Sequence, residues 1–167
     1  MPNWCEGNIR VRGTYNNVVA FLKDALTVVE GHFDGKEYKT TEKPADVEVN
    51  ENNVVFRAST SDFYIKGTHR NFISSKTIEV YDNYEDGEEH TWVFDSFIAA
   101  WSFNHGVSHD AYTEFAKKYN VDIKLFGIEQ GMQFQEEVIY YRTGSYDEKT
   151  VTYDDWDFDC PFPNMGG

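Results

Sequence analysis

The stretch that decides the fold is CEGNIRVRG, residues 5–13, because its alternate residues differ in character. With the two-residue period of a strand, one face carries its small and apolar side chains, namely Cys5, Gly7, Ile9 and Val11. Arg10 and Arg12 fall on the opposite face. The pattern predicts a first strand with an apolar inner face. Trp4 is expected to point outward, towards the C-terminal tail around Trp156.

A helix is predicted directly after this strand, with Thr14 as its N-cap and Gly31 as its stop. Apolar residues recur through this segment at helical spacing, namely Val18, Phe21, Leu22, Ala25, Leu26 and Val29. The polar stretch 32–44 that follows is predicted to be a long loop.

Alternation and turn residues predict several further elements. They are a hairpin at 46–58, a short strand or helix start at 63–67, and strands at 76–84, 90–101, 121–131 and 134–144. In the strand predicted at 90–101, one face carries Trp92, Phe94, Ser96 and Ile98 only if the strand is unbroken. A second helix is predicted with Ser108 as its N-cap and a helical stripe of Tyr112, Phe115, Ala116 and Tyr119.

This order of elements predicts an α+β protein, a two-layer ferredoxin-like sandwich with a mainly antiparallel sheet and two amphipathic helices on one face. Residues 1–145 are expected to form that domain. Residues 146–167 are expected to form an acidic, aromatic C-terminal extension that packs on or near it.

The charge of the chain limits its partners. Its 167 residues include 29 Asp and Glu against 15 Lys and Arg, giving a net charge of -14. Such a field repels phosphate backbones and anionic membranes, so neither direct nucleic-acid binding nor membrane binding is expected. The partners that fit are basic proteins or cations, and the alternative is that the charge serves solubility alone.

No signal peptide, membrane-spanning stretch or metal-binding cysteine motif is visible, which predicts a cytoplasmic protein with reduced thiols. A disulfide between Cys5 and Cys160 remains an alternative under oxidising conditions. His105 and His109 have a zinc-like spacing, but the expected cap at Ser108 places His105 in a loop. Cys5 is expected to act as a small buried hydrophobe. We therefore expect no cofactor, metal or catalytic residue.

Two acidic clusters interleaved with aromatic residues are the predicted partner-binding sites. The first comprises Asp82, Tyr84, Glu85, Asp86, Glu88 and Glu89. The second comprises Asp147, Asp154, Asp155, Trp156, Asp157 and Asp159. Carboxylates spaced by flat rings imitate nucleic acid, and Tyr and Trp are frequent in interfaces. The alternative is a solvated acidic turn together with a tail that packs its rings on the sheet.

The opening MPNWCEGNIRVRG, residues 1–13, resembles that of the YubB ferredoxin-like domain family, small plasmid- and bacteriophage-borne proteins. AAWS at 99–102, EFAKKY at 114–119 and EQGMQF at 129–134 resemble the second-helix region and following hairpin of that family. The resemblance implies a ferredoxin-like fold, a mobile-element origin and a bacterial host cell, and it implies no activity. The family's Trp-rich middle stretch is replaced here by the segment 78–94.

Together these features predict a mobile-element-encoded acidic binding protein. Its expected partner is a basic host nucleic-acid-handling or defence protein, such as a CRISPR effector nuclease, which it inhibits by electrostatic imitation of DNA. One alternative is a structural or assembly protein, monomeric or homodimeric. Others are a hydrolytic enzyme that uses carboxylates and a single-strand nucleic-acid binder that uses Arg10 and Arg12.

Overall fold

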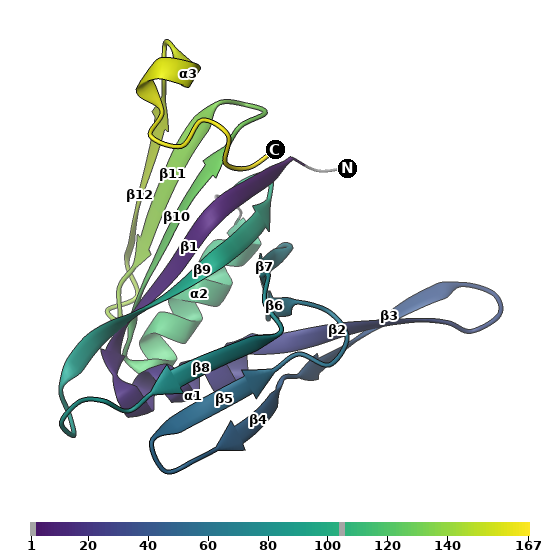
Figure 1. Ribbon diagram of the computed structural model, residues 1–167, viewed down its shortest axis with the longest axis vertical. Coiled ribbons are helices and arrows are strands. Elements are labelled where there is room, and N and C mark those ends of the chain that lie inside the picture. Colours follow the sequence, from purple (N-terminus) through teal and green to yellow (C-terminus); the bar gives the residue numbers. More distant parts are fainter. Residues whose placement is uncertain (1–2, 104–105) are drawn as a thin grey trace.

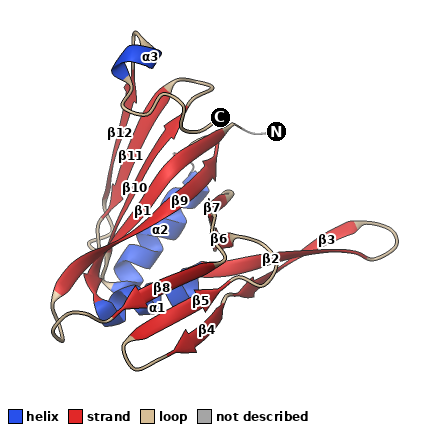
Figure 2. Ribbon diagram, in the orientation of Figure 1, coloured by secondary structure: helices blue, strands red, loops and turns tan. Residues whose placement is uncertain are grey.

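The protein is described by a computed structural model that covers residues 3–103 and 106–167. Its elements are β1 (Trp4–Thr14), α1 (Tyr15–Ala25), β2 (Leu26–Phe33), β3 (Tyr38–Pro44), β4 (Asp46–Val49), β5 (Asn53–Arg57), β6 (Phe63–Ile65), β7 (Asn71–Ile73), β8 (Thr77–Tyr81), β9 (Glu89–Ala100), α2 (Gly106–Tyr119), β10 (Asp122–Glu129), β11 (Phe134–Tyr140), β12 (Tyr146–Thr152) and α3 (Trp156–Asp159). Within these described ranges, a nine-stranded sheet has the order β12-β11-β10-β1-β9-β7-β6-β2-β3, and a second sheet has the order β4-β5-β8 (Figures 1 and 2).

The predicted two-layer ferredoxin-like sandwich is wrong. Strands hold 49% of the described residues and helices only 18%, so the protein is mostly antiparallel sheet rather than a sheet with a matching helical layer. The reason is that segments without a clear apolar period still pair as strands. The stretch 32–44 completes the β2–β3 hairpin, and the segment from Tyr146 forms the edge strand β12. In addition, β4, β5 and β8, which alternation did predict, form a separate sheet.

The helices α1 and α2 lie on one face of the long sheet, where the main core is found (Figure 1). The predicted inner face of β1 is confirmed, since Cys5, Ile9 and Val11 are buried while both arginines of the strand are exposed. The rings of Phe21 and Phe115 join the two helices edge to face, with centroids 5.5 Å apart. The three-stranded sheet contributes to the same core through Val54, Phe56, Ile78 and Val80.

The start of α1 agrees with the prediction from the sequence, and its end does not. Thr14 is the N-cap, and its hydroxyl accepts a hydrogen bond from the backbone N–H of Asn17 at 3.3 Å. The helix ends at Ala25 rather than near Gly31, because the β-branched run that follows favours a strand. Leu26 begins β2, which pairs with β6.

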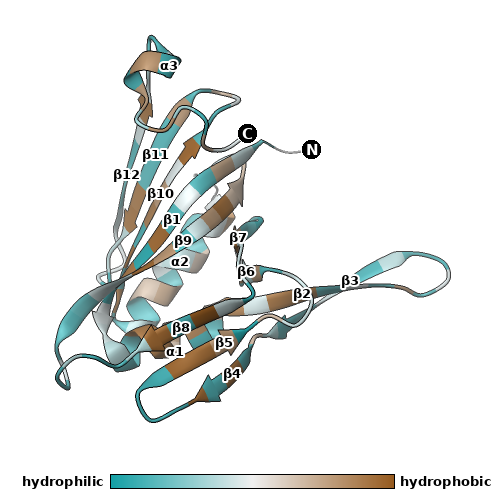
Figure 3. Ribbon diagram, in the orientation of Figure 1, coloured by the Kyte–Doolittle hydropathy of each residue, from teal (hydrophilic) through white to brown (hydrophobic). Residues whose placement is uncertain are grey.

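The predicted loop at 32–44 is instead the distal half of a hairpin that projects from the body (Figure 1). Asp34 builds its turn, because its side chain accepts hydrogen bonds from the backbone N–H groups of Lys36 at 3.0 Å and Glu37 at 3.1 Å. All of β3 is exposed, and Figure 3 shows hydrophilic residues along it. A strand exposed on both faces has no apolar alternation, so the pattern gave no sign of it.

The condition set for the strand at 90–101 is not met in β9, and the N-cap expected for α2 is wrong. The long strand is not continuous in register, because an irregularity in its pairing with β1 places Ser96 at a φ of 58°. Phe94 and Phe97 therefore both reach the core. Ser108 is not an N-cap but lies buried within α2, where its hydroxyl accepts a hydrogen bond from the backbone N–H of His69. His105 lies outside the described residues.

The C-terminal segment returns to the start of β1. Trp156 and Cys160 pack with Ile128 of β10 in a small second apolar cluster. The backbone N–H of Gly167 donates a hydrogen bond to the carbonyl of Trp4 at 3.0 Å. The Trp4 ring itself packs edge to face on Phe72 of β7, with centroids 6.2 Å apart, rather than on the aromatic residues of the tail.

Candidate functional sites

The first predicted cluster forms the exposed turn between β8 and β9. Every residue from Tyr81 to Glu89 is exposed. The Tyr84 ring is not free, since it stacks on His90 with centroids 3.4 Å apart, and Glu88 also contacts that imidazole at 3.2 Å. Glu89 forms an ion pair with Arg142, so it is occupied within the chain.

The second cluster is divided by the structure. Asp147 lies on β12, where it accepts a hydrogen bond from the Tyr141 hydroxyl at 3.0 Å. Its other members lie in or beside α3, namely Asp154, Asp155, Trp156, Asp157 and Asp159. In Figure 1 α3 lies at one end of the long axis and the β8–β9 turn lies towards the other. The α3 part of the second cluster is therefore not continuous with the first cluster.

The segment 154–159 forms a small protrusion, which we call the Phe158 knob. Phe158 is 86% exposed, while Trp156 is only 5% exposed. The two rings thus have opposite roles: Trp156 lies inside the protein, and Phe158 is presented to the solvent. Phe158 was missing from the predicted site because sequence spacing alone does not tell which ring of an aromatic pair faces the core.

Several contacts hold the Phe158 knob in one conformation. The Trp156 indole donates a hydrogen bond to the carbonyl of Pro163 at 2.9 Å and packs against the Tyr153 ring. Asp155 is the N-cap of α3, and its side chain accepts a hydrogen bond from the backbone N–H of Phe158 at 3.3 Å. The backbone that carries Phe158 is therefore fixed, while its ring extends into the solvent.

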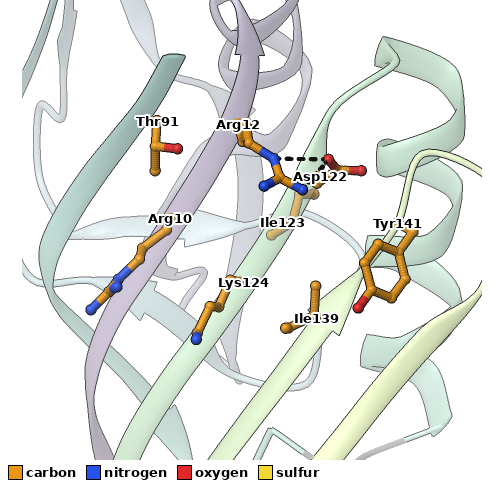
Figure 4. A pocket seen from close by; sticks show the side chains of 8 residues that line it. All are labelled: Arg10, Arg12, Thr91, Asp122, Ile123, Lys124, Ile139 and Tyr141. Atoms are coloured by element: carbon orange, nitrogen blue, oxygen red, sulfur yellow. Dashed lines mark hydrogen bonds and ion pairs between the residues drawn. The ribbon is translucent and has the colours of Figure 1, made fainter. Parts of the chain in front are cut away.

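A second surface of the opposite charge lies on the outer face of the long sheet. We call it the β1–β10 hollow. It has a volume of about 400 Å³ and is lined by Arg10, Arg12, Thr91, Asp122, Ile123, Lys124, Ile139 and Tyr141 (Figure 4). Three cations and one carboxylate thus face one depression of a strongly acidic chain.

Asp122 organises the cationic rim. Its carboxylate accepts hydrogen bonds from the Arg12 guanidinium at 2.8 and 3.1 Å and from Arg142 at 3.1 and 3.2 Å, and also from the Arg142 backbone N–H at 3.0 Å. Burial raises the pKa of Asp122, but the hydrogen bonds from Arg142 and Arg12 outweigh it and hold the pKa below its ordinary value. The carboxylate stays ionised and fixes the orientation of Arg12.

Two buried glutamates lie on the opposite, inner face near Cys5. Glu129 accepts hydrogen bonds from the backbone N–H groups of the β10–β11 turn, and Glu136 accepts one from the Phe103 N–H at 2.7 Å. Burial, together with the charges of Glu136 and Glu129, raises the pKa of the Cys5 thiol, which therefore stays protonated. Both cysteines are buried and free rather than paired. These residues hold the fold together rather than form a nucleophilic site.

His109, the second histidine of the zinc-like pair, belongs to a packed polar network. Its Nδ1 lies 2.9 Å from the Tyr140 hydroxyl, its Nε2 lies 3.5 Å from Glu148, and its ring stacks on Tyr146. Across the described ranges, no group of three or more His, Cys, Asp or Glu side chains is placed to hold a metal ion. No described helix is long and apolar enough to cross a membrane.

Comparison of the chain with protein-family models, with curated proteins and with solved structures finds no match. The resemblance of its opening to the YubB family therefore stays a prediction, and the function has to be argued from the two surfaces themselves.

Proposed function

We propose that the chain is a non-enzymatic binding protein of a mobile element, which docks onto a basic host protein through the Phe158 knob and inhibits it. The observation that carries the proposal is the 86% exposure of Phe158 on a turn that is otherwise fixed. An exposed aromatic side chain on a fixed backbone suits an interface, because Phe, Tyr and Trp are enriched in protein–protein interfaces.

The charges around Phe158 support a basic partner. Asp154, Asp157 and Asp159 are exposed, and none of them forms an ion pair with another described residue. Carboxylates without a partner inside the protein attract a cationic surface on another molecule. This attraction speeds association with a basic partner, and the same charges repel acidic proteins. A pocket with an apolar floor and a Lys- or Arg-rich rim fits this arrangement.

Nucleic-acid-handling proteins supply such surfaces, because their clefts are lined with Lys and Arg. A CRISPR effector nuclease or a similar defence factor is the partner class that we favour, in line with the mobile-element resemblance. Docking through one knob makes the contact more local than imitation of a long DNA segment.

The test is capture of a purified basic nuclease by the immobilised chain, together with an assay of DNA cleavage. We expect capture to weaken at least tenfold in Phe158→Ser and in the triple variant Asp154→Asn, Asp157→Asn, Asp159→Asn, and to weaken as salt is added. Asp155 and Trp156 are left unchanged, because they hold the turn.

The matched control is the neutralised β8–β9 turn, with Asp82→Asn, Glu85→Gln and Asp86→Asn, which removes the same amount of charge elsewhere. Binding that is lost equally in both triple variants would indicate a bulk charge effect. Binding that is unchanged in folded Phe158→Ser, as checked by thermal melting, would contradict the proposal.

A further inference from the structure

We propose that the β1–β10 hollow binds a small phosphorylated ligand of about the size of a mononucleotide. Its phosphate lies against Arg10, Arg12 and Lys124, and its apolar part lies against Ile139 and Tyr141. This site is independent of the Phe158 knob, since it lies on the open outer face of the sheet and uses side chains of the opposite charge.

Arg10 offers guanidinium N–H donors that form no ion pair within the described residues. Its Nε donates a hydrogen bond to the Asn8 side chain at 2.9 Å, which fixes the plane of the guanidinium. No carboxylate of the described chain lies within ion-pair distance of Arg10, although the chain carries 29 acidic residues. A guanidinium held in this way presents its terminal nitrogens to a planar or tetrahedral oxyanion.

Arg12 and Lys124 flank this position and are oriented by carboxylates. Arg12 is held by Asp122, and Lys124 forms an ion pair with Glu137 at 2.6 Å. Figure 4 shows the three cationic side chains on the two neighbouring strands β1 and β10, with Ile139 and Tyr141 on the next strand and its end. The hollow thus combines fixed positive charge with an apolar wall, the combination that small-molecule sites use.

The size of the hollow and the charges at its border limit the ligand. A volume of about 400 Å³ is near the lower end of the range of small-molecule pockets. Carboxylates stand around it: Glu89 beside Arg142, Glu137 beside Lys124, and Asp147 beside the Tyr141 hydroxyl. A single phosphate group placed in the hollow meets the three cations and only one lining carboxylate, Asp122, whereas a longer polyanion also has to pass the carboxylates at the border. The surroundings therefore favour a short phosphate ester over a nucleic-acid strand.

The experiment is an NMR titration of the full chain at low salt with four probes: inorganic pyrophosphate, adenosine monophosphate, adenosine without phosphate, and a single-stranded thymidine oligonucleotide. We expect saturable shifts of amide signals in β1 and β10 with adenosine monophosphate, weaker binding of pyrophosphate, and no binding of adenosine. Arg10→Gln and Lys124→Gln should each weaken the adenosine monophosphate affinity about tenfold.

The control variant is Arg57→Gln, which removes an exposed arginine paired with Glu48 on the separate three-stranded sheet and should bind like the unaltered chain. Equal affinity in folded Arg10→Gln, shifts that do not saturate, or equal binding of adenosine would each overturn the proposal. An oligonucleotide that saturates the hollow while adenosine monophosphate does not would overturn it in favour of a strand-binding surface.

Discussion

Asp24 of α1 and Lys118 of α2 form an ion pair of 2.7 Å that ties the two helices together. The same carboxylate also accepts hydrogen bonds from Lys66 at 2.8 Å and from the Tyr119 hydroxyl at 2.6 Å. One side chain thus connects α1, α2 and the loop after β6, three segments that are far apart in the sequence.

Replacement of this carboxylate should make stability less dependent on pH. The hydrogen bonds from Lys118, Lys66 and Tyr119 lower the pKa of Asp24 below its ordinary 3.8. A lowered pKa stabilises the fold above that ordinary value, and the contribution is lost as the pH falls below it. Asp24→Asn should therefore reduce the free energy of unfolding by about 1 kcal/mol at neutral pH, since its partners are largely exposed.

Urea unfolding between neutral pH and about pH 3 measures this effect. The difference between Asp24→Asn and the unaltered chain should narrow in the acidic part of that range. Asp110→Asn, which removes an exposed carboxylate of α2, is the control and should show no such change. A constant difference at all pH values would rule out the ionisation mechanism.

Packing around Cys5 leaves no space for a methyl group at Gly127. A Cβ there would lie 2.6 Å from the Cys5 sulfur and 2.7 Å from the Phe103 ring. Gly127→Ala should therefore cost about 2 kcal/mol of unfolding free energy through overpacking. Gly106→Ala, where a Cβ meets open space, is the matched control and should be close to neutral.

The double variant Gly127→Ala, Cys5→Ala should regain part of that loss, because removal of the sulfur frees the nearest contact. Cys5→Ala alone should cost about 1 kcal/mol through lost burial and leave partner capture by the Phe158 knob intact. Loss of capture in a folded Cys5→Ala variant would show that the thiol has a role besides packing.

Glu129 is a buried carboxylate that closes the β10–β11 turn. Its oxygens accept hydrogen bonds from the backbone N–H groups of Gly131 at 2.8 Å and Met132 at 2.6 Å. Glu129→Gln replaces one acceptor with a donor, which then faces a backbone donor, so we expect a loss of about 2 kcal/mol. Thermal and urea unfolding check this against Glu51→Gln in an exposed turn, and equal stability of the two variants would contradict the capping role.

The β2–β3 hairpin should be stabilised only at its base. Phe33 is 67% exposed near the tip, whereas Val28 of the same strand is 3% exposed and pairs with Phe63. Phe33→Ser should change the unfolding free energy by less than about 0.5 kcal/mol, and Val28→Ala should cost about 2 kcal/mol. A large loss in Phe33→Ser would indicate that the distal hairpin packs on the body in solution.

Strands with alternating apolar residues or clear turn residues could be predicted from the sequence, and strands without such a pattern could not. The alternation around Ile9 gave β1, and the Glu51–Asn53 turn gave the β4–β5 hairpin. The distal stretch 32–44 of the β2–β3 hairpin could not be predicted, because its strand residues are exposed on both faces. Its pairing is held by backbone hydrogen bonds that almost any sequence can form. The helix was overextended to Val29 because the apolar residues of a strand happened to continue its spacing.

The candidate sites, like the strands, could be predicted from the sequence only in part. The sequence located the acidic segment around Trp156, but it did not tell that Trp156 is buried and Phe158 is presented. It placed Arg10 and Arg12 on the outer face of the first strand. It gave no sign that Lys124 and Tyr141 line the same hollow, since register between strands decides which side chains become neighbours.

The sequence by itself determined the acidic field, the apolar inner face of β1 and the capped start of α1. These are local properties, set by charge, by the two-residue period and by the hydroxyl of Thr14. Only the tertiary structure decided that β12 would pair with β11 and that the Trp156 ring would be buried while the Phe158 ring is exposed. It also decided that Arg10, Arg12 and Lys124 would line one hollow. Those outcomes depend on contacts between segments far apart in the chain, and local spacing carries no information about such contacts.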